Sequence, residues 1–135
     1  MKNLKLSYIL IIALTLLSSC QCYGSNLKTT YMQELKAISK IKGNGSNELF
    51  TLIRATSSEL EKDWSKELAQ ELARVFNELL NVNENYFLVE LIGPVVQKRS
   101  KEFIPILNKA LSKKNSKLYK EMLEMDKNEE KHGNG

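Results

Sequence analysis

The spacing of the large apolar residues between Trp64 and Leu80 constrains the fold of this chain more than any other feature. They recur at intervals of three and four, with two adjacent pairs: Trp64, Leu68, Leu72, Val75, Phe76, Leu79 and Leu80. An α-helix has about 3.6 residues per turn, so this spacing places them on one face. A strand would need strict alternation, and the chain shows no convincing run of it. The sequence therefore predicts an all-α fold.

Similar spacings predict a compact domain of about five or six short helices over residues 27–127. We expect helices over about 30–42, 47–56, 58–81 and 84–98, with two more beginning at Ser100 and Ser116. Ser58 and Glu61 have the spacing of a capping box, and Gly93-Pro94 should kink the fourth helix. Residues 128–135 are polar and contain glycine, which predicts a disordered tail.

Two segments of the predicted domain correspond at an offset of 39 residues. The matching pairs are Leu52 and Leu91, Ile53 and Ile92, Trp64 and Phe103, Leu68 and Leu107, and Leu72 and Leu111. This period is similar to that of helix-pair repeats of the HEAT and armadillo kind. Two such pairs with flanking helices, or an irregular helical bundle, would both explain the pattern.

The first residues have the composition of an export signal. Lys2 and Lys5 precede the apolar run from Leu6 to Leu17, which ends at small residues. These twelve residues fall short of the roughly 20 that a membrane-spanning helix needs. A positive start, a short apolar segment and a small-residue exit are typical of a secretion signal.

The exit from this segment resembles the lipobox of bacterial lipoprotein precursors. Leu17, Ser18 and Ser19 precede Cys20 in the order of an aliphatic residue, two small residues and the modified cysteine. The resemblance implies a signal peptide over residues 1–19 and attachment of lipid to Cys20. Because Gln21 follows rather than aspartate, it also implies the outer membrane, on the side facing the periplasm, rather than the inner membrane. An ordinary secreted protein cut near Gly24 is the alternative.

The remaining chain begins with a predicted tether over residues 20–26, followed by the helical domain. Without Lys2 and Lys5 the basic residues fall from 20 to 18 against 16 acids, a net charge of +2. This small excess, without a recognised motif, argues against nucleic-acid binding. The charge is uneven: residues 46–90 hold nine acids and four bases, and residues 91–125 hold eight bases and three acids. Two surfaces of opposite charge are therefore expected.

Catalytic and metal-binding patterns are missing from the sequence. The single histidine, His132, lies in the predicted tail, where it cannot form an oriented triad or a zinc site. Phosphate-loop and calcium-loop spacings are not met. We therefore expect no enzyme activity, no metal and no cofactor.

A partner-binding surface is predicted around residues 59–71. Glu59, Asp63, Glu67 and Glu71 fall four residues apart and would form an acidic stripe on one helix face. Such a stripe suits a basic partner, although a solvated face is the alternative. Trp64 lies beside it and fits either the core or the centre of an interface.

These features predict a non-catalytic, lipid-anchored envelope protein that binds another protein. In size, anchor and helical character it is similar to immunity proteins and inhibitors that protect bacteria from secreted toxins. A structural or exclusion lipoprotein of the cell envelope is the alternative function.

Overall fold

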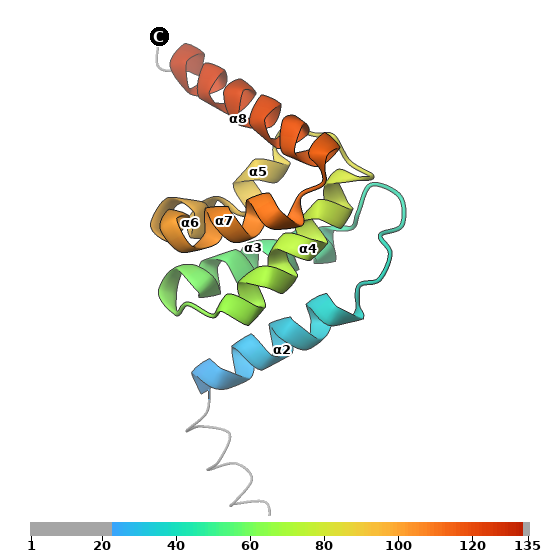
Figure 1. Cartoon of the computed structure of the whole chain (residues 1–135), viewed down its shortest axis with the longest axis vertical. Helices are drawn as coiled ribbons and strands as arrows, with labels where there is room; N and C mark the ends of the chain where they lie inside the picture. The colour runs from blue at the N-terminus through green and yellow to red at the C-terminus, as the bar shows by residue number, and fades with distance from the viewer. Residues whose placement is uncertain (1–22, 134–135) are drawn as a thin grey trace, which may run out of the picture.

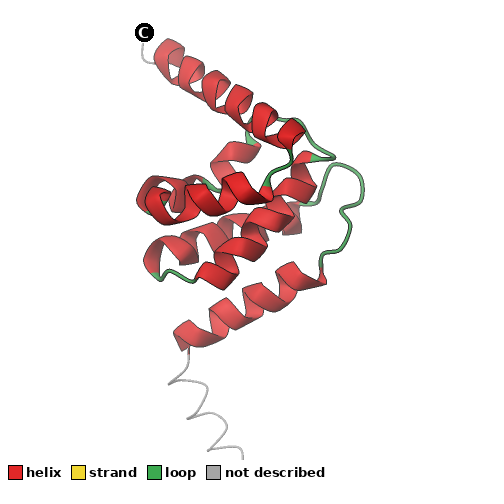
Figure 2. Cartoon of the chain, in the orientation of Figure 1, coloured by secondary structure: helices red, strands yellow, loops and turns green. Residues whose placement is uncertain are grey.

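The computed structural model describes residues 23–133; the predicted signal peptide and Cys20 lie outside this range. The described residues form seven α-helices and no strand, which confirms the all-α prediction (Figure 2). The helices, labelled as in Figure 1, are α2 (Tyr23–Ala37), α3 (Asn47–Lys62), α4 (Lys66–Leu80), α5 (Leu88–Leu91), α6 (Gly93–Lys98), α7 (Ser100–Ala110) and α8 (Lys113–Gly133).

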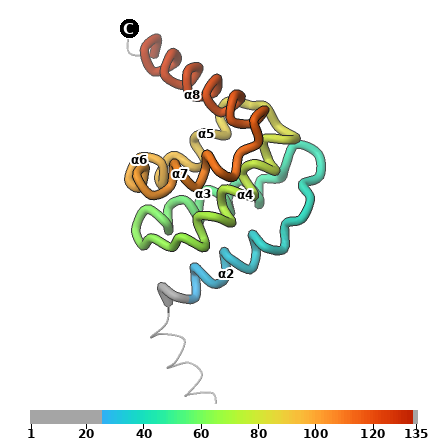
Figure 3. Tube along the Cα trace, viewed as in Figure 1, coloured from blue at the N-terminus to red at the C-terminus, as the bar shows by residue number. Residues whose placement is uncertain are grey.

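Two helical hairpins stack on each other in the middle of the molecule. Helices α3 and α4 form the first hairpin, and α6 and α7 form the second; α3 packs on α6, and α4 packs on α7. Helix α2 covers α4 and α3 at one end of the stack, and α8 lies at the opposite end (Figures 1 and 3). The arrangement agrees with two helix pairs flanked by single helices.

Most of the residues matched at the offset of 39 are buried in both segments, although Leu91 and Ile92 lie at the end of α5 and not in the second hairpin. Ile53 and Ile92 are both buried, as are Leu68 and Leu107. Leu72 and Leu111 are also buried, whereas Trp64 is half-buried and its counterpart Phe103 is fully buried. The repeated pattern therefore reflects similar packing at these positions, except that Trp64 and Leu52 are half-buried where their counterparts Phe103 and Leu91 are buried.

Polar side chains join the ends of successive helices. Arg74 on α4 donates to the carbonyl oxygens of Leu35 (2.8 Å) and Ile38 (3.0 Å) at the end of α2. Asn115 on α8 donates to the Asn77 carbonyl oxygen on α4 at 3.0 Å. The Leu35 and Asn77 carbonyl oxygens also accept the backbone N–H groups of Ile38 and Asn81, so the side chains add a second hydrogen bond at these two helix ends and join them to the next helix.

The first helix differs from the prediction at both ends. Helix α2 covers 23–37 rather than about 30–42, so residues 23–26 of the predicted tether are helical. Arg74 binds the carbonyls of Leu35 and Ile38, and a loop follows. Gly45 in this loop has φ +91°, where a side chain would be strained, and an added Cβ would lie 3.0 Å from Phe50.

The predicted break near residue 57 was wrong. Helix α3 continues to Lys62, with Thr56 and Ser57 fully buried within it, so Ser58 and Glu61 do not form a capping box at a helix start. The Thr56 hydroxyl donates to the Leu52 carbonyl at 2.7 Å, and Ser57 Oγ accepts from the Val95 N–H of α6 at 3.1 Å. These hydrogen bonds satisfy the buried hydroxyl groups, so Thr56 and Ser57 can lie in the interior of a helix.

The later helices also depart from their predicted limits. The kink expected at Gly93-Pro94 is a complete break at Ile92 between α5 and α6, with Pro94 in the first turn of α6. Helix α8 begins at Lys113 instead of Ser116, because Ser112 Oγ accepts from the Asn115 N–H at 3.2 Å. It continues to Gly133, so residues 128–133 of the predicted disordered tail are helical. Lys131 and His132 in the last turn favour this extension through the helix dipole.

Candidate functional site

The predicted acidic stripe is divided between two helices. Glu59 lies on α3, Asp63 ends that helix, and Glu67 and Glu71 lie on α4 after the turn. Because the chain reverses direction between them, the spacing of four does not create one continuous helical face. The four carboxylates therefore do not form the surface that the sequence suggested.

Internal contacts also occupy part of this predicted site. Asp63 forms an ion pair with Lys28 of α2, and Glu71 pairs with Arg74 at 2.9 Å. Trp64 lies in the turn between α3 and α4, so it is not part of the apolar face of α4. Its side chain is half-buried and packs against the core. Glu59 and Glu67 are the two stripe residues without an ion pair to a described side chain; Glu59 is half-buried and Glu67 is exposed.

A groove that the sequence did not predict lies between α8 and the α5–α6 segment. We call it the acid-lined groove. It has a volume of about 540 Å³ and is lined by Glu61, Val89, Glu90, Gly93, Pro94, Val96, Gln97, Tyr119, Leu123, Asp126 and Glu130. Its floor, as the term is used below, consists of the buried and half-buried apolar residues Val89, Val96, Tyr119 and Leu123. Acidic residues from three helices, α3, α5 and α8, lie around this floor.

The periodicity of α8 creates one wall of the acid-lined groove. Tyr119, Leu123, Asp126 and Glu130 follow at intervals of four, three and four, which places them on one face of the helix. Tyr119 is buried and contacts Phe76 of α4 edge-on, with ring centroids 6.2 Å apart. This contact fixes the inner part of α8, whereas Glu130 is exposed near its outer end. The wall therefore changes from apolar to acidic along α8.

The break between α5 and α6 creates the opposite wall. Gly93 and Pro94 begin α6, and the half-buried Val96 follows one turn later. The Val95 N–H cannot find a partner in its own first turn and is satisfied by Ser57 from α3. That hydrogen bond holds α6 against α3 and keeps Gly93 at the groove surface.

The four carboxylates of the acid-lined groove have no ion pair with a described lysine or arginine. The ion pairs found within residues 23–133 involve Asp63, Glu71, Glu84 and Glu121 instead. The nearby Tyr86 hydroxyl donates to Glu129 Oε2 at 3.2 Å, and this hydrogen bond raises the pKa of Tyr86. The charges of Glu90 and Asp126 raise the pKa of Tyr86 further. The groove is therefore a region of concentrated negative charge.

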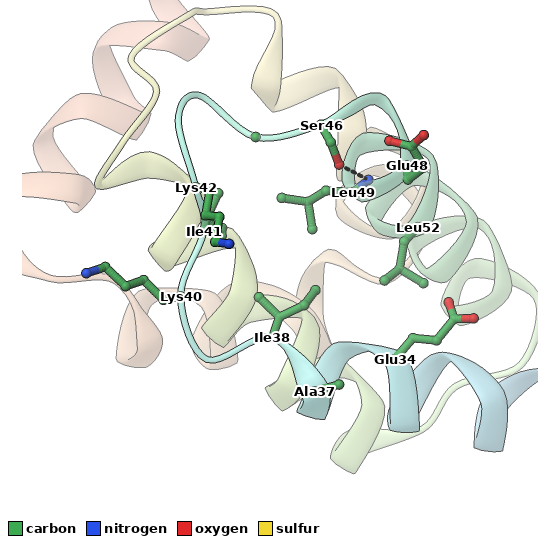
Figure 4. Close-up of a pocket in the computed structure, with 11 residues that line it drawn as sticks. Glu34, Ala37, Ile38, Lys40, Ile41, Lys42, Ser46, Glu48, Leu49 and Leu52 are labelled. Atoms are coloured by element: carbon green, nitrogen blue, oxygen red, sulfur yellow. Dashed lines mark hydrogen bonds between the residues drawn. The ribbon is translucent and has the colours of Figure 1, made fainter.

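A second groove lies between the end of α2, the following loop and the start of α3 (Figure 4). It has a volume of about 560 Å³ and an aliphatic lining that includes Ile38, Ile41, Leu49 and Leu52. Lys40 and Lys42 lie on one side of it, with Glu34 and Glu48 on the other. Its charges are mixed, so it offers less electrostatic selectivity than the acid-lined groove.

The described part of the chain contains no group of three or more histidine, cysteine, aspartate and glutamate residues able to hold a metal ion. His132 lies exposed in the last turn of α8. Within residues 23–133, no helix is both long enough and apolar enough to cross a membrane.

No protein-family model, curated protein or solved structure matches this chain. The choice of a candidate site therefore depends on the geometry and charge of the described residues. Of the two grooves above, the acid-lined groove combines an apolar floor with charge of one sign, which is the combination expected of a selective binding surface.

Proposed function

We propose that this protein is a non-catalytic, lipid-anchored protein of the bacterial envelope that binds a partner protein at the acid-lined groove. The observation that carries the proposal is the set of four carboxylates without an ion pair among the described residues, gathered around an apolar floor. Carboxylates of one sign around a groove attract a partner of opposite charge, and an apolar floor can bury that partner's apolar side chains.

The position of the groove supports this proposal. Helix α2 begins at Tyr23, three positions after Cys20, and lies at the opposite end of the stack from α8 (Figure 1). The Lys28–Asp63 ion pair and the hydrogen bonds of Arg74 hold α2 against the two-hairpin stack. A molecule attached through Cys20 would therefore present the acid-lined groove away from the membrane.

A secreted toxin is the partner class that fits the export signal, the small helical domain and the acidic surface together. A toxin that acts on an anionic substrate needs a positively charged surface to attract it. An inhibitor can block such a toxin by covering that surface, and electrostatic attraction would make its capture fast. We therefore propose an immunity protein or inhibitor, with Glu90 and Asp126 as the central contacts of the groove.

Reversing two charges in the acid-lined groove should remove the partner. We expect Glu90→Lys with Asp126→Lys to lower partner affinity by at least about tenfold, because charge contacts at interfaces control both encounter and specificity. The measurement is quantitative mass spectrometry of envelope proteins captured by the detergent-solubilised full chain. The protein lost with the variant is then purified, and its dissociation constant is measured.

The control for this experiment is Glu34→Lys with Glu124→Lys. Both residues are exposed and lie outside the acid-lined groove. Glu34 belongs to the lining of the second groove, between the end of α2 and the start of α3. The control makes the same change in net charge, so it should retain the partner. Identical captured proteins for both variants would contradict binding at the acid-lined groove.

A further inference from the structure

The walls of the acid-lined groove are both helical, and this limits the shape of what can lie between them. Tyr119 to Glu130 of α8 span about three turns, or roughly 17 Å at about 1.5 Å per residue. The facing wall is formed by α5 and α6, and no strand edge is present in residues 23–133. Ridges of side chains on a third helix can pack between two helices, whereas an extended peptide would find no edge to pair with.

The lining of the groove changes in chemistry along its length. Tyr119 is buried and Leu123 half-buried toward the core, while Asp126 and Glu130 follow toward the end of α8. Across the groove, Val89 and Val96 are apolar and Glu90 is exposed. A matching occupant therefore needs apolar side chains in one part and lysine or arginine in the next turn.

Gly93 gives the occupant room to approach. It lines the groove, and a Cβ added to it would have no atom within 4 Å beyond its own neighbouring residues. Its φ is not in the left-handed region, so a side chain there is not strained by the backbone. A longer residue at this position would extend into open space at the groove surface.

Resting on the proposed function, we infer that the part of the partner that enters the acid-lined groove is a single amphipathic α-helix of about three turns, with leucine-like residues facing Leu123 and basic residues facing Asp126 and Glu130. Complementarity of charge selects this occupant, because the groove carries carboxylates of one sign and no described cation pairs with them. The apolar turn of the helix would cover the exposed part of the floor.

The inference is tested with a fluorescently labelled helical peptide about three turns long. The peptide carries leucine on one face and arginine in its last turn, and a scrambled peptide of the same composition is compared with it. Fluorescence anisotropy is measured with the full-length protein in uncharged detergent micelles, and binding to empty micelles is subtracted. We expect the scrambled peptide to bind at least about tenfold more weakly, because its apolar and basic residues no longer share the required faces.

Gly93→Met tests the steric part of the inference without changing charge. We expect it to weaken peptide binding by at least about tenfold, because the new side chain occupies the space of the helix. Gly93→Ala adds one carbon and should bind within about twofold of wild type. Far-UV circular dichroism and the unfolding midpoint show whether each variant is folded, and both variants should be at least as stable as wild type, because Gly93 is helical without a positive φ.

Three outcomes would overturn the inference: equal binding of the ordered and scrambled peptides, unchanged binding to Gly93→Met, or a dimer that this substitution dissociates. The last would make a second copy of this chain the occupant. The proposed function fails separately, when the Glu90→Lys, Asp126→Lys variant captures the same proteins as wild type. Loss of captured partner without peptide binding would leave the proposed function intact and exclude only the helical occupant.

Discussion

Replacement of Cys20 by serine is expected to abolish lipid attachment and release the protein from the envelope membrane. The resemblance to a lipobox assigns the lipid to the Cys20 sulfur, and a serine hydroxyl offers no thiol for the thioether bond. Each buried methylene contributes about 0.8 kcal/mol to membrane binding, so losing the acyl chains that the resemblance implies would remove nearly all of it. The expected effect is therefore close to complete.

This prediction is measured by growing cells with an alkyne-bearing fatty acid and then separating membranes from soluble proteins. Cys22→Ser is the matched control, because it removes a thiol two positions away and should leave both labelling and membrane association unchanged. Labelling that persists in Cys20→Ser would contradict the proposed anchor. So would a native protein whose mass includes Met1 and no acyl chain.

Phe76→Ala should produce the largest loss of stability of any single substitution considered. Phe76 is fully buried on α4 and contacts Tyr119 edge-on at a ring-centroid distance of 6.2 Å. Removal of a buried phenylalanine side chain costs about 3–5 kcal/mol, since both apolar burial and packing are lost. Domains of this size have about 5–15 kcal/mol in total, so the variant should lie near the limit of folding.

Urea unfolding followed by far-UV circular dichroism measures this effect. Phe50→Ala provides a comparison, because Phe50 also has an edge-on aromatic partner, Phe87, but is only half-buried. We expect its midpoint to fall by much less. Equal losses for the two variants would show that the Phe76–Tyr119 contact is not central to the core, and would weaken the case that it positions α8 beside the groove.

Apolar periodicity was sufficient to predict a compact all-α fold, and it left two stacked helix pairs and an irregular bundle as alternatives. Leu68, Leu72 and Leu107 are buried, as the period of about 3.6 residues per turn predicts. This period can be recognised without knowing which other helices pack against them. The helix boundaries were harder to predict from the sequence, because contacts between helices determine them. Arg74 binds the carbonyl at Leu35 from another helix, and Ser57 stays inside α3 because the Val95 N–H lies against it. Neither contact could be predicted from neighbouring residues, because each one joins residues 38 or 39 positions apart in the sequence.

The candidate site was missed for a related reason. The predicted stripe at residues 59–71 assumed one helix, and the turn at Trp64 divides it. The acid-lined groove instead collects Glu61, Glu90, Asp126 and Glu130 from distant parts of the chain. One signal was available: Tyr119, Leu123, Asp126 and Glu130 share a helical face. Of these four residues, only Glu130 falls in the segment 128–135 that was predicted to be disordered, and it lies on α8.

In-cell photocrosslinking tests most directly whether a partner occupies the acid-lined groove. A photoreactive amino acid is placed at Gln97, an exposed residue of the groove lining, and in a separate strain at Glu124, which is exposed on α8 outside the groove. We expect the Gln97 probe to give one discrete crosslinked protein after irradiation and the Glu124 probe to give none. An absence of adducts from Gln97, or the same adducts from both positions, would contradict the proposed binding site.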